Sequence, residues 1–580
     1  MPVNPTYPGV YVQEIPSGVR TITGVATSIT AFIGSAPRGA VDEPTIITSY
    51  ADFERNFGGL DVLHPMSYAV QDFYLNGGSQ AVIVRLFNDT KDDNTKIAAT
   101  WKQTIAGLHV QAASPGVWGN NLKLTIDNNV ASDAPANAFN LLIQEKVKGI
   151  VVRTEQFRTL TIDGPRRIDK VLKAQSQLLR WDDSNPLPSS DIATAFTTAL
   201  APVVTAQTNL KTAQDALTAA QQASPQDPAA ITAAQTAVNT AQTAVNNAVT
   251  TLNTPSGHTA ATGGPPLPLK VSTFLPTDGE VNKEGVFQLE KVDLFNILCV
   301  PPYKNLDNDG GDIDTTAALL SPLAEYCQRR RAMLLIDAPS DWTSPATAIA
   351  GLPNIISAIG GSSLAKNVVL HFPRIQKADV LNDGRIETFT PSGAMAGIFA
   401  RTDTQRGVWK APAGLEASIV GIAGVSVPLT DNENGRLNPL AINCLRTFPA
   451  SGTVAWGART LQGDDRLASE WKYIPVRRTA LYIEESLYRG LQWVVFEPNA
   501  EPLWAQIRLN VGAFMHNLFV KGAFQGQTPR DAYFVKCDKE TTTQNDIDLG
   551  IVNIVVGFAP LKPAEFVIIS LQQIAGQILV

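Results

Sequence analysis

Short continuous apolar runs are concentrated in two regions of the sequence, residues 24–87 and 287–445. In the first region, residues 24–40 and 80–87 are apolar enough for buried strands, and residues 66–75 have the spacing of a helix. The second region alternates similar runs with segments that are long enough for helices. The runs are residues 294–300, 332–336 and 368–372, and the helices are expected within 315–331 and 343–360. Continuous apolar strands that alternate with helices predict a parallel sheet covered on both faces.

A different pattern fills residues 101–275. Segments such as residues 122–126 and 140–145 predict a β-rich module, whereas residues 191–254 are rich in Ala, Thr, Gln and Asn and carry almost no charge. Large apolar residues recur there every seven positions, with an alanine three positions after each. They are Val203, Leu210 and Leu217 and, after a break at residues 224–228, Ile231, Val238, Val245 and Leu252. Two matching heptad seams predict an antiparallel helical hairpin. The alternative is a flexible low-complexity linker, but a linker would not be expected to keep two matching heptad patterns.

Strand-forming segments are predicted at both ends of the chain. Residues 1–22 combine several prolines, which oppose helix, with Tyr7, Val10 and Val12, which favour extended backbone. The C-terminal part is predicted to form helices at residues 479–493 and 503–522 and strands at 551–558 and 565–572. A terminal strand cannot fold alone, so both ends are expected to need a partner sheet.

These patterns predict a multidomain protein of the α/β and α+β classes. We expect an N-terminal extended arm (1–22), a first part of the core (23–100), a β-rich insertion domain (101–275) containing the hairpin 191–254, an α/β domain (276–445), a C-terminal α+β domain (446–560) and a C-terminal strand arm (561–580).

Composition excludes several broad classes. The 580 residues are 44% apolar and 17% charged, which is typical of a folded protein. The net charge of −7 argues against nucleic-acid binding, which needs clustered Lys and Arg. The N-terminus lacks the features of a signal peptide, and no apolar run reaches the roughly 18 residues that cross a bilayer. We therefore expect production in the cytoplasm, no membrane insertion and no nucleic-acid partner.

Catalytic and metal-binding motifs are not found in the sequence. The histidines are isolated, the cysteines are far apart, and no glycine-rich stretch has the spacing of a nucleotide-binding loop. These residues are His64, His109, His258, His371 and His516, and Cys299, Cys327, Cys444 and Cys537. We expect no catalysis, no cofactor and no metal. The rival hypothesis is a hydrolase-like enzyme that uses Asp337, because this residue ends a predicted parallel strand, where open α/β sheets bind ligands.

Two basic clusters allow two interpretations. One is Arg329 to Arg331, and the other is Lys472 with Arg477 and Arg478. Each is either a solvated helix end or turn, or a contact with an acidic partner surface.

Several segments resemble one known family. They include residues 7–18 (YPGVYVQEIPSG), 76–85 (NGGSQAVIVR), 391–403 (PSGAMAGIFARTD), 456–459 (WGAR), 473–478 (YIPVRR) and 563–566 (PAEF). In this order, they resemble the contractile tail sheath proteins of phages and the sheaths of pyocin-like and antifeeding-type injection particles. The hairpin at residues 191–254 is not part of that resemblance.

The resemblance implies a structural function: helical polymerisation around an inner tube, and contraction that drives the tube through a cell envelope. It implies a subtilisin-like α/β core without a protease site, and terminal strands that are exchanged between subunits. The residues implied for the arms are Tyr7, Val10, Tyr11, Val12, Ile15, Phe566, Ile568 and Ser570. Candidate tube contacts are Lys472, Arg477, Arg478, Glu484, Glu485 and Arg489.

The partners implied are further copies of the chain in stacked, hexameric rings, the inner tube protein, and baseplate and tail terminator proteins. The assembly would be a virion tail or the sheath of an injection particle, and the sequence leaves both open. The hairpin is expected to project from the outer surface of the sheath. A third hypothesis makes it a surface adhesin.

Overall fold

The computed structural model describes residues 20–89, 100–131, 133–135, 137–260, 267–304, 312–314 and 317–570. Most of the predicted N-terminal arm lies outside the described residues. This holds for all of its candidate residues, Tyr7, Val10, Tyr11, Val12 and Ile15.

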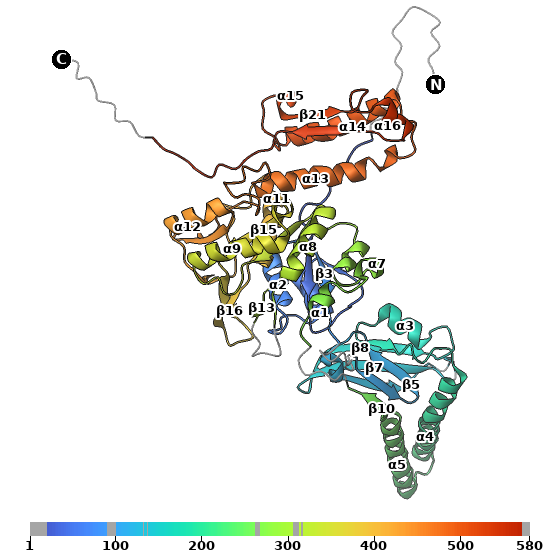
Figure 1. Cartoon of the computed structure of the whole chain (residues 1–580). Coiled ribbons are helices and arrows are strands. Elements are labelled where there is room, and N and C mark those ends of the chain that lie inside the picture. The colour runs from blue at the N-terminus through green and yellow to red at the C-terminus, as the bar shows by residue number, and fades with distance from the viewer. Residues whose placement is uncertain are drawn as a thin grey trace, which may run out of the picture.

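A large mixed sheet forms the centre of the molecule (Figure 1). Its strands, from edge to edge, are β2 Thr45–Ile47, β3 Ala81–Arg85, β1 Thr30–Gly34, β11 Ile297–Cys299, β14 Met333–Asp337, β15 Val368–Phe372, β19 Asn443–Phe448 and β20 Gly452–Ala455. All neighbours from β3 to β19 are parallel, and only the two edge strands are antiparallel. The predicted parallel sheet is confirmed, and each predicted apolar run coincides with one of its strands to within one residue or contains it.

The expected domain boundary at residue 445 is wrong, because it falls inside β19. The sheet continues through β20, which turns back on β19 and closes the edge. A second small sheet, β17-β16-β18, lies beyond β15, and its strands are Arg385–Phe389, Ile375–Asp379 and Gly424–Val425.

Helices cover both faces of the large sheet. One face packs against α1 Tyr50–Phe57, α2 Met66–Leu75 and α11 Ser392–Arg406, and the other against α8 Ala317–Arg329 and α9 Pro345–Ile359. Short helices α6 Val271–Phe274, α7 Gly279–Asn282, α10 Ser362–Ala365 and α12 Asp431–Leu437 fill the rim.

Two glycines allow α11 to lie directly on α2. A Cβ atom at Gly393 would lie 2.1 Å from the carbonyl oxygen of Ala69, and one at Gly397 would lie 2.4 Å from that of Phe73. No side chain fits at such distances, so the small residues four positions apart set the contact between these helices.

Within the segment between β3 and β11, the described residues from 100 to 260 form a separate β-rich body with its own core (Figure 1). One sheet contains β10 Pro255–Thr259, β4 Lys102–Ile105, β5 Leu108–Ala112 and β9 Leu179–Trp181, and the other β6 Leu122–Asp127, β7 Phe139–Val147 and β8 Ile150–Leu160. Helix α3, Ile168–Gln175, completes the core of this body.

The hairpin lies where the heptads predict it, as α4 Ser190–Gln222 and α5 Pro228–Leu252. Its base belongs to the β-rich body, since Phe196 and Val203 are buried there. Farther out, only the seam is shielded: Leu217 and Val238 are half-buried, while most of their neighbours are exposed. The hairpin points away from the C-terminal region (Figure 1).

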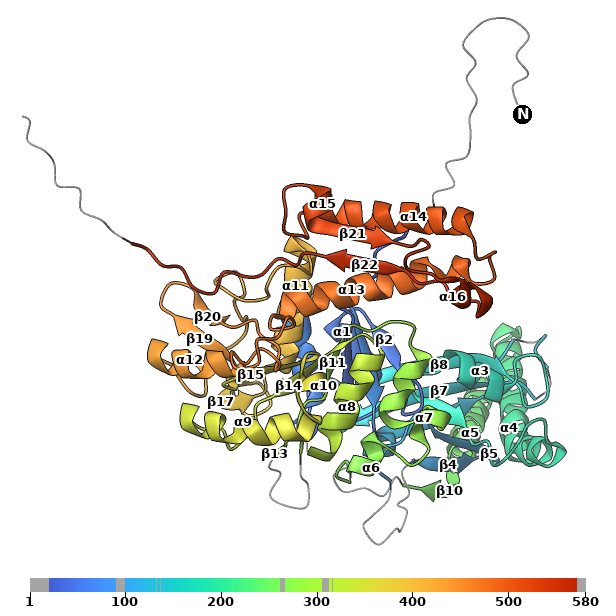
Figure 2. The ribbon, with the colours of Figure 1, turned by 45° about the horizontal axis from the view of Figure 1, so that its top comes forward.

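The C-terminal region packs above the large sheet (Figure 2). Its helices are α13 Ile474–Gly490, α14 Glu501–Val520, α15 Pro529–Ala532 and α16 Gln544–Asp548, and its strands are β21 Tyr533–Lys536 and β22 Val555–Phe558. Both predicted helices and the strand predicted at 551–558 are present, but β21 was not predicted. The strand predicted at 565–572 is not formed over its described part, residues 565–570, because no strand of the described chain pairs with it. No described helix is both long and apolar enough to cross a membrane.

Candidate assembly site

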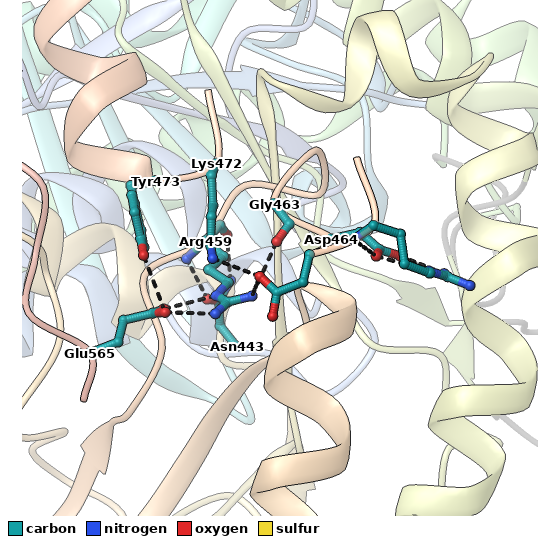
Figure 3. A network of polar contacts seen from close by, with 9 residues as sticks. Asn443, Arg459, Gly463, Asp464, Lys472, Tyr473 and Glu565 are labelled. Carbon is teal, nitrogen blue, oxygen red and sulfur yellow. Dashed lines mark hydrogen bonds and ion pairs between the residues drawn. The ribbon is translucent and has the colours of Figure 1, made fainter. Parts of the chain in front are cut away.

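A buried arginine holds the start of the C-terminal arm (Figure 3). Arg459 follows β20, and its side chain is fully buried. Its guanidinium donates from Nε and Nη2 to the two carboxylate oxygens of Glu565, at 2.8 and 2.6 Å. Its Nη1 donates to Asp465 at 2.9 Å and to the carbonyl oxygen of Gly463 at 3.2 Å. A bidentate ion pair of this kind fixes the orientation of the two side chains as well as the distance between them.

Hydrogen bonds from the large sheet hold the backbone of Arg459 in place. Asn443, the first residue of β19, accepts a hydrogen bond from the backbone N–H of Arg459 at 2.7 Å and donates to its carbonyl oxygen at 2.8 Å. The same amide donates to the carbonyl oxygen of Leu370 on β15 at 3.0 Å. The arm is therefore tied to the rigid core and not to a loose loop.

The charges of this network reinforce one another. Burial acts to lower the pKa of Arg459, but the hydrogen bonds and charge of Glu565, together with Asp465, outweigh it and hold the pKa above its usual value. The hydrogen bond from Lys472, with the nearby Arg459 charge, lowers the pKa of Asp465. The hydroxyl of Tyr473 donates to Glu565 at 3.2 Å. Arg459 and Asp465 therefore stay ionised near neutral pH.

Glu565 is the last residue of the described arm that the core holds. Beyond it, Phe566, Val567, Ile568 and Ile569 have 75%, 80%, 89% and 78% of their surfaces exposed. Four consecutive exposed apolar residues in an extended segment are typical of a strand that pairs with another chain. Of the arm candidates, Phe566, Ile568 and Ser570 lie on this exposed segment.

A small sheet at the same end of the molecule could receive such strands. β21 and β22 pair only with each other among the described strands, so each leaves one edge open. Phe534 and Val555 on these strands are about half exposed, at 50% and 44%. A two-stranded ribbon is marginal in isolation, and further strands would complete it.

Replacing Glu565 by glutamine is expected to loosen the arm. The amide keeps the shape but loses the charge, which weakens the anchor by about 1.5 kcal/mol and raises the released population about tenfold. A nitroxide on Ala564→Cys would report the release as a narrower EPR spectrum, because the four native cysteines are buried. The matched control is Asp464→Asn, which breaks the neighbouring pair with Arg466 and not the anchor. Equal spectra for Glu565→Gln and its parent would contradict the anchoring role.

The candidate tube contacts lie on or beside α13, and most are engaged within the chain. Arg477 donates to Asn367 at 3.1 Å and to Glu484 at 3.2 Å, and Arg478 forms a buried ion pair with Asp403 at 2.6 Å. These arginines hold α13 on the α/β core, so neither interpretation of the cluster, a solvated surface or a free contact, describes them.

The remaining candidates are also paired. Glu485 is buried between Arg331 and Arg489, at 3.0 and 2.7 Å, and Lys472 contacts Asp465 at 2.6 Å. Arg489 also reaches Asp293 at 2.6 Å, and Glu484 is 43% exposed. That this helix faces a tube stays a prediction. In the other basic cluster, Arg329 contacts Glu280 at 2.7 Å.

Asp337, the residue of the enzyme hypothesis, caps a helix. Its carboxylate accepts from the backbone N–H of Ser392 at 2.9 Å and from the hydroxyl of Ser392 at 2.7 Å, at the first residue of α11. Burial raises its pKa to about 6 against the effect of these hydrogen bonds. Among the described residues, no group of three His, Cys, Asp or Glu side chains is arranged to hold a metal ion.

This capping role predicts a pH dependence. The folded pKa of Asp337, about 6, lies above its ordinary value of 3.8, so the folded state binds this proton more tightly. The contribution of Asp337 to stability is therefore fully present below pH 3.8 and falls by up to about 3 kcal/mol as the pH rises through 6. Asp337→Asn should remove this fall, because the amide is neutral throughout and still accepts the N–H of Ser392. Urea unfolding from pH 4 to 7.5 measures the free energy of unfolding of both proteins. If the two plots of this free energy against pH run parallel, the prediction is wrong.

Parts of the chain are similar in sequence to known tail sheath proteins. Residues 468–574, which contain α13, α14 and the described part of the arm, match the family model of the phage tail sheath C-terminal domain. A putative prophage major tail sheath protein of Pseudomonas aeruginosa is 26% identical over 252 residues, 43% of this chain and 59% of that protein. The tail sheath protein of Burkholderia phage BcepMu is 28% identical over 290 residues, 47% of this chain and 57% of that protein. The chain thus spans somewhat more than half of the length of these relatives.

A solved structure extends the likeness to almost the whole chain. The helical sheath of the anti-feeding prophage in its contracted state is 21% identical, covers 98% of this chain and 99% of that chain, and gives a TM-score of 0.51. At this identity the match shows a shared fold. The multidomain α/β architecture is confirmed by it, and the resemblance to tail sheath proteins that the sequence motifs indicate is confirmed by the family match and the two relatives.

Proposed function

We propose that this chain is the structural subunit of a contractile sheath that polymerises helically around an inner tube and contracts to drive it through a target cell envelope. The observation that carries the proposal is the exposed apolar segment beyond Glu565, anchored at its root and lying at the same end of the molecule as an incomplete sheet. A protein that worked as a monomer would have no use for such a segment.

In the proposed assembly, the terminal arms of neighbouring copies add to the open edges of β21 and β22. Strand addition of this kind supplies main-chain hydrogen bonds for affinity and alternate side chains for register. Because the donor and acceptor surfaces differ, the contact is head-to-tail and can propagate into a helix. Because the arm is anchored at Glu565 and extended beyond it, subunits can shift relative to one another while the exchanged strand stays paired.

Several finer features belong to the same proposal. The α/β core is of the subtilisin-like type, without a protease site. The subunits form stacked hexameric rings that meet an inner tube protein, a baseplate and a tail terminator, in a virion tail or an injection particle. The relatives named above are described as sheath proteins, which supports a function without catalysis.

Removal of residues 1–20 tests the proposal. The full-length protein is expected to form tubes or contracted polysheath in negative-stain electron microscopy, and the truncated protein to remain monomeric in size-exclusion chromatography with light scattering. Monomers from the full-length protein at high concentration would refute it.

The hairpin provides a control for this experiment. Deleting residues 208–243 removes its exposed outer part and leaves Phe196 and Val203 in the core of the β-rich body. Since the hairpin points away from the C-terminal region, this variant should still form tubes (Figure 1).

A further inference from the structure

The loop between α13 and α14 carries an exposed aromatic side chain in its middle. Phe496 is fully exposed, and Val495 beside it is 59% exposed. Phe496 also has a φ of 70°, in the left-handed region that bulky residues rarely adopt. Backbone outliers of this kind cluster at functional sites, where the surrounding contacts hold them in place.

A groove of 640 Å³ lies at the opposite end of the same two helices. Its apolar walls include Trp409, Trp456 and Pro563. Ala458, which also lines it, accepts the first backbone N–H of α13, and Gly522 follows the end of α14. Helices of 17 and 20 residues separate this groove from Phe496 by about 25–30 Å.

The charges around the two features are opposite. Glu497 and Glu501 beside Phe496 are exposed, whereas Arg406, Lys410 and Lys562 line the groove together with Glu565, whose charge is paired with Arg459. Of these, Arg406 is paired with Glu416 and Glu501 with Arg508, in pairs that lie at the surface. Complementary charge favours one orientation of encounter over others.

We propose that Phe496 of one copy inserts into the groove of the next copy, between Trp409, Trp456 and the anchored start of the C-terminal arm. The inference deepens the proposed function and rests on it, because it names a contact between subunits of that assembly. The two surfaces lie at opposite ends of α13 and α14, as Figure 2 shows from the places of α15 and α16, so copies that share one orientation each donate Phe496 at one end and receive it at the other. Copies joined in this way would line up head to tail.

Disulfide trapping tests the contact. The full-length protein with Phe496→Cys and Ala564→Cys, oxidised at high concentration, is expected to give a ladder of dimers, trimers and larger species in non-reducing electrophoresis. Ala564 is exposed and lines the groove, and the native cysteines are buried. Phe496→Cys alone should stop at a dimer. Phe496→Cys with Val281→Cys should also give no ladder, because Val281 is exposed on α7, on the opposite side of the molecule from α12, which lines the groove (Figure 2).

The outcomes are distinct from those of the proposed function. Tubes without a ladder would overturn the inference and leave the sheath assignment standing. A ladder without tubes would support the inference and count against the sheath. A product that stops at dimers in the double variant would also overturn it, since a head-to-tail contact propagates.

A second variant tests the same contact without cysteines. Phe496→Asn keeps a residue that tolerates the left-handed backbone, so the loop should fold, while the aromatic ring is lost. It is expected to raise the protein concentration needed for assembly at least tenfold, and Val281→Asn should not. Unchanged assembly of Phe496→Asn would contradict the proposal.

Discussion

Replacing Asp403 by alanine is expected to lower the free energy of unfolding by about 3–5 kcal/mol. Asp403 on α11 and Arg478 on α13 have only 4% and 3% of their side-chain surfaces exposed. The guanidinium donates to both carboxylate oxygens, at 2.8 and 2.6 Å, and the hydroxyl of Thr27 donates to the same carboxylate at 2.6 Å. Without Asp403, a buried positive charge would remain with the carbonyl oxygen of Thr27 as its polar partner.

The surface pair on the same helix provides the control. Arg406 and Glu416 are 51% and 66% exposed, so Glu416→Ala should cost less than about 1 kcal/mol. Urea unfolding of both variants at low protein concentration, followed by circular dichroism, measures the difference. Equal losses in the free energy of unfolding would mean that burial does not determine how much the Asp403 pair contributes to stability. The expected loss would show that this pair fastens α13 of the C-terminal region to α11 of the α/β core.

Continuous apolar runs made the large sheet predictable. A strand such as β15, with five buried residues in a row, is buried whatever its neighbours are. The short strand β21 could not be predicted in the same way. Its sequence YFVK alternates half-exposed and exposed positions, and it forms a strand because it pairs with β22. Likewise, a heptad seam is a local signal, so the hairpin was predicted almost to its end residues.

The assembly site was only partly predictable. The resemblance pointed to the arm, but the anchor joins Arg459 to Glu565, which are 106 positions apart. One signal was available: Glu565 is the single charged residue next to the apolar run that follows it, and such a charge needs a partner. The intrachain partners of Arg477 and Arg478 could not be predicted for the same reason, since Asn367 and Asp403 lie on distant elements.

The double variant Phe566→Asp with Ile568→Asp is expected to abolish assembly while leaving the monomer as stable as the parent. Both side chains are more than 70% exposed in the single chain, at 75% and 89%, so the fold does not depend on them. As alternate residues of an extended segment, they share one face, which a receiving sheet would bury. Loss of their burial costs about 1.5–3 kcal/mol for each, and introduced charges add to that, so association should weaken by at least roughly 100-fold.

The matched rescue is Phe566→Leu with Ile568→Val, which keeps an apolar face and should restore tubes. Sedimentation velocity over a range of concentrations measures association, and urea unfolding verifies that all three proteins share one stability. Tubes formed by the aspartate variant at the parent's concentration would mean that this face of the arm is not what the neighbouring copy binds. A loss of monomer stability would instead place the segment against its own subunit, in conflict with the exposure of Phe566 and Ile568. Normal stability with lost assembly would show that the substituted residues contact a second copy and do not support the fold of their own subunit.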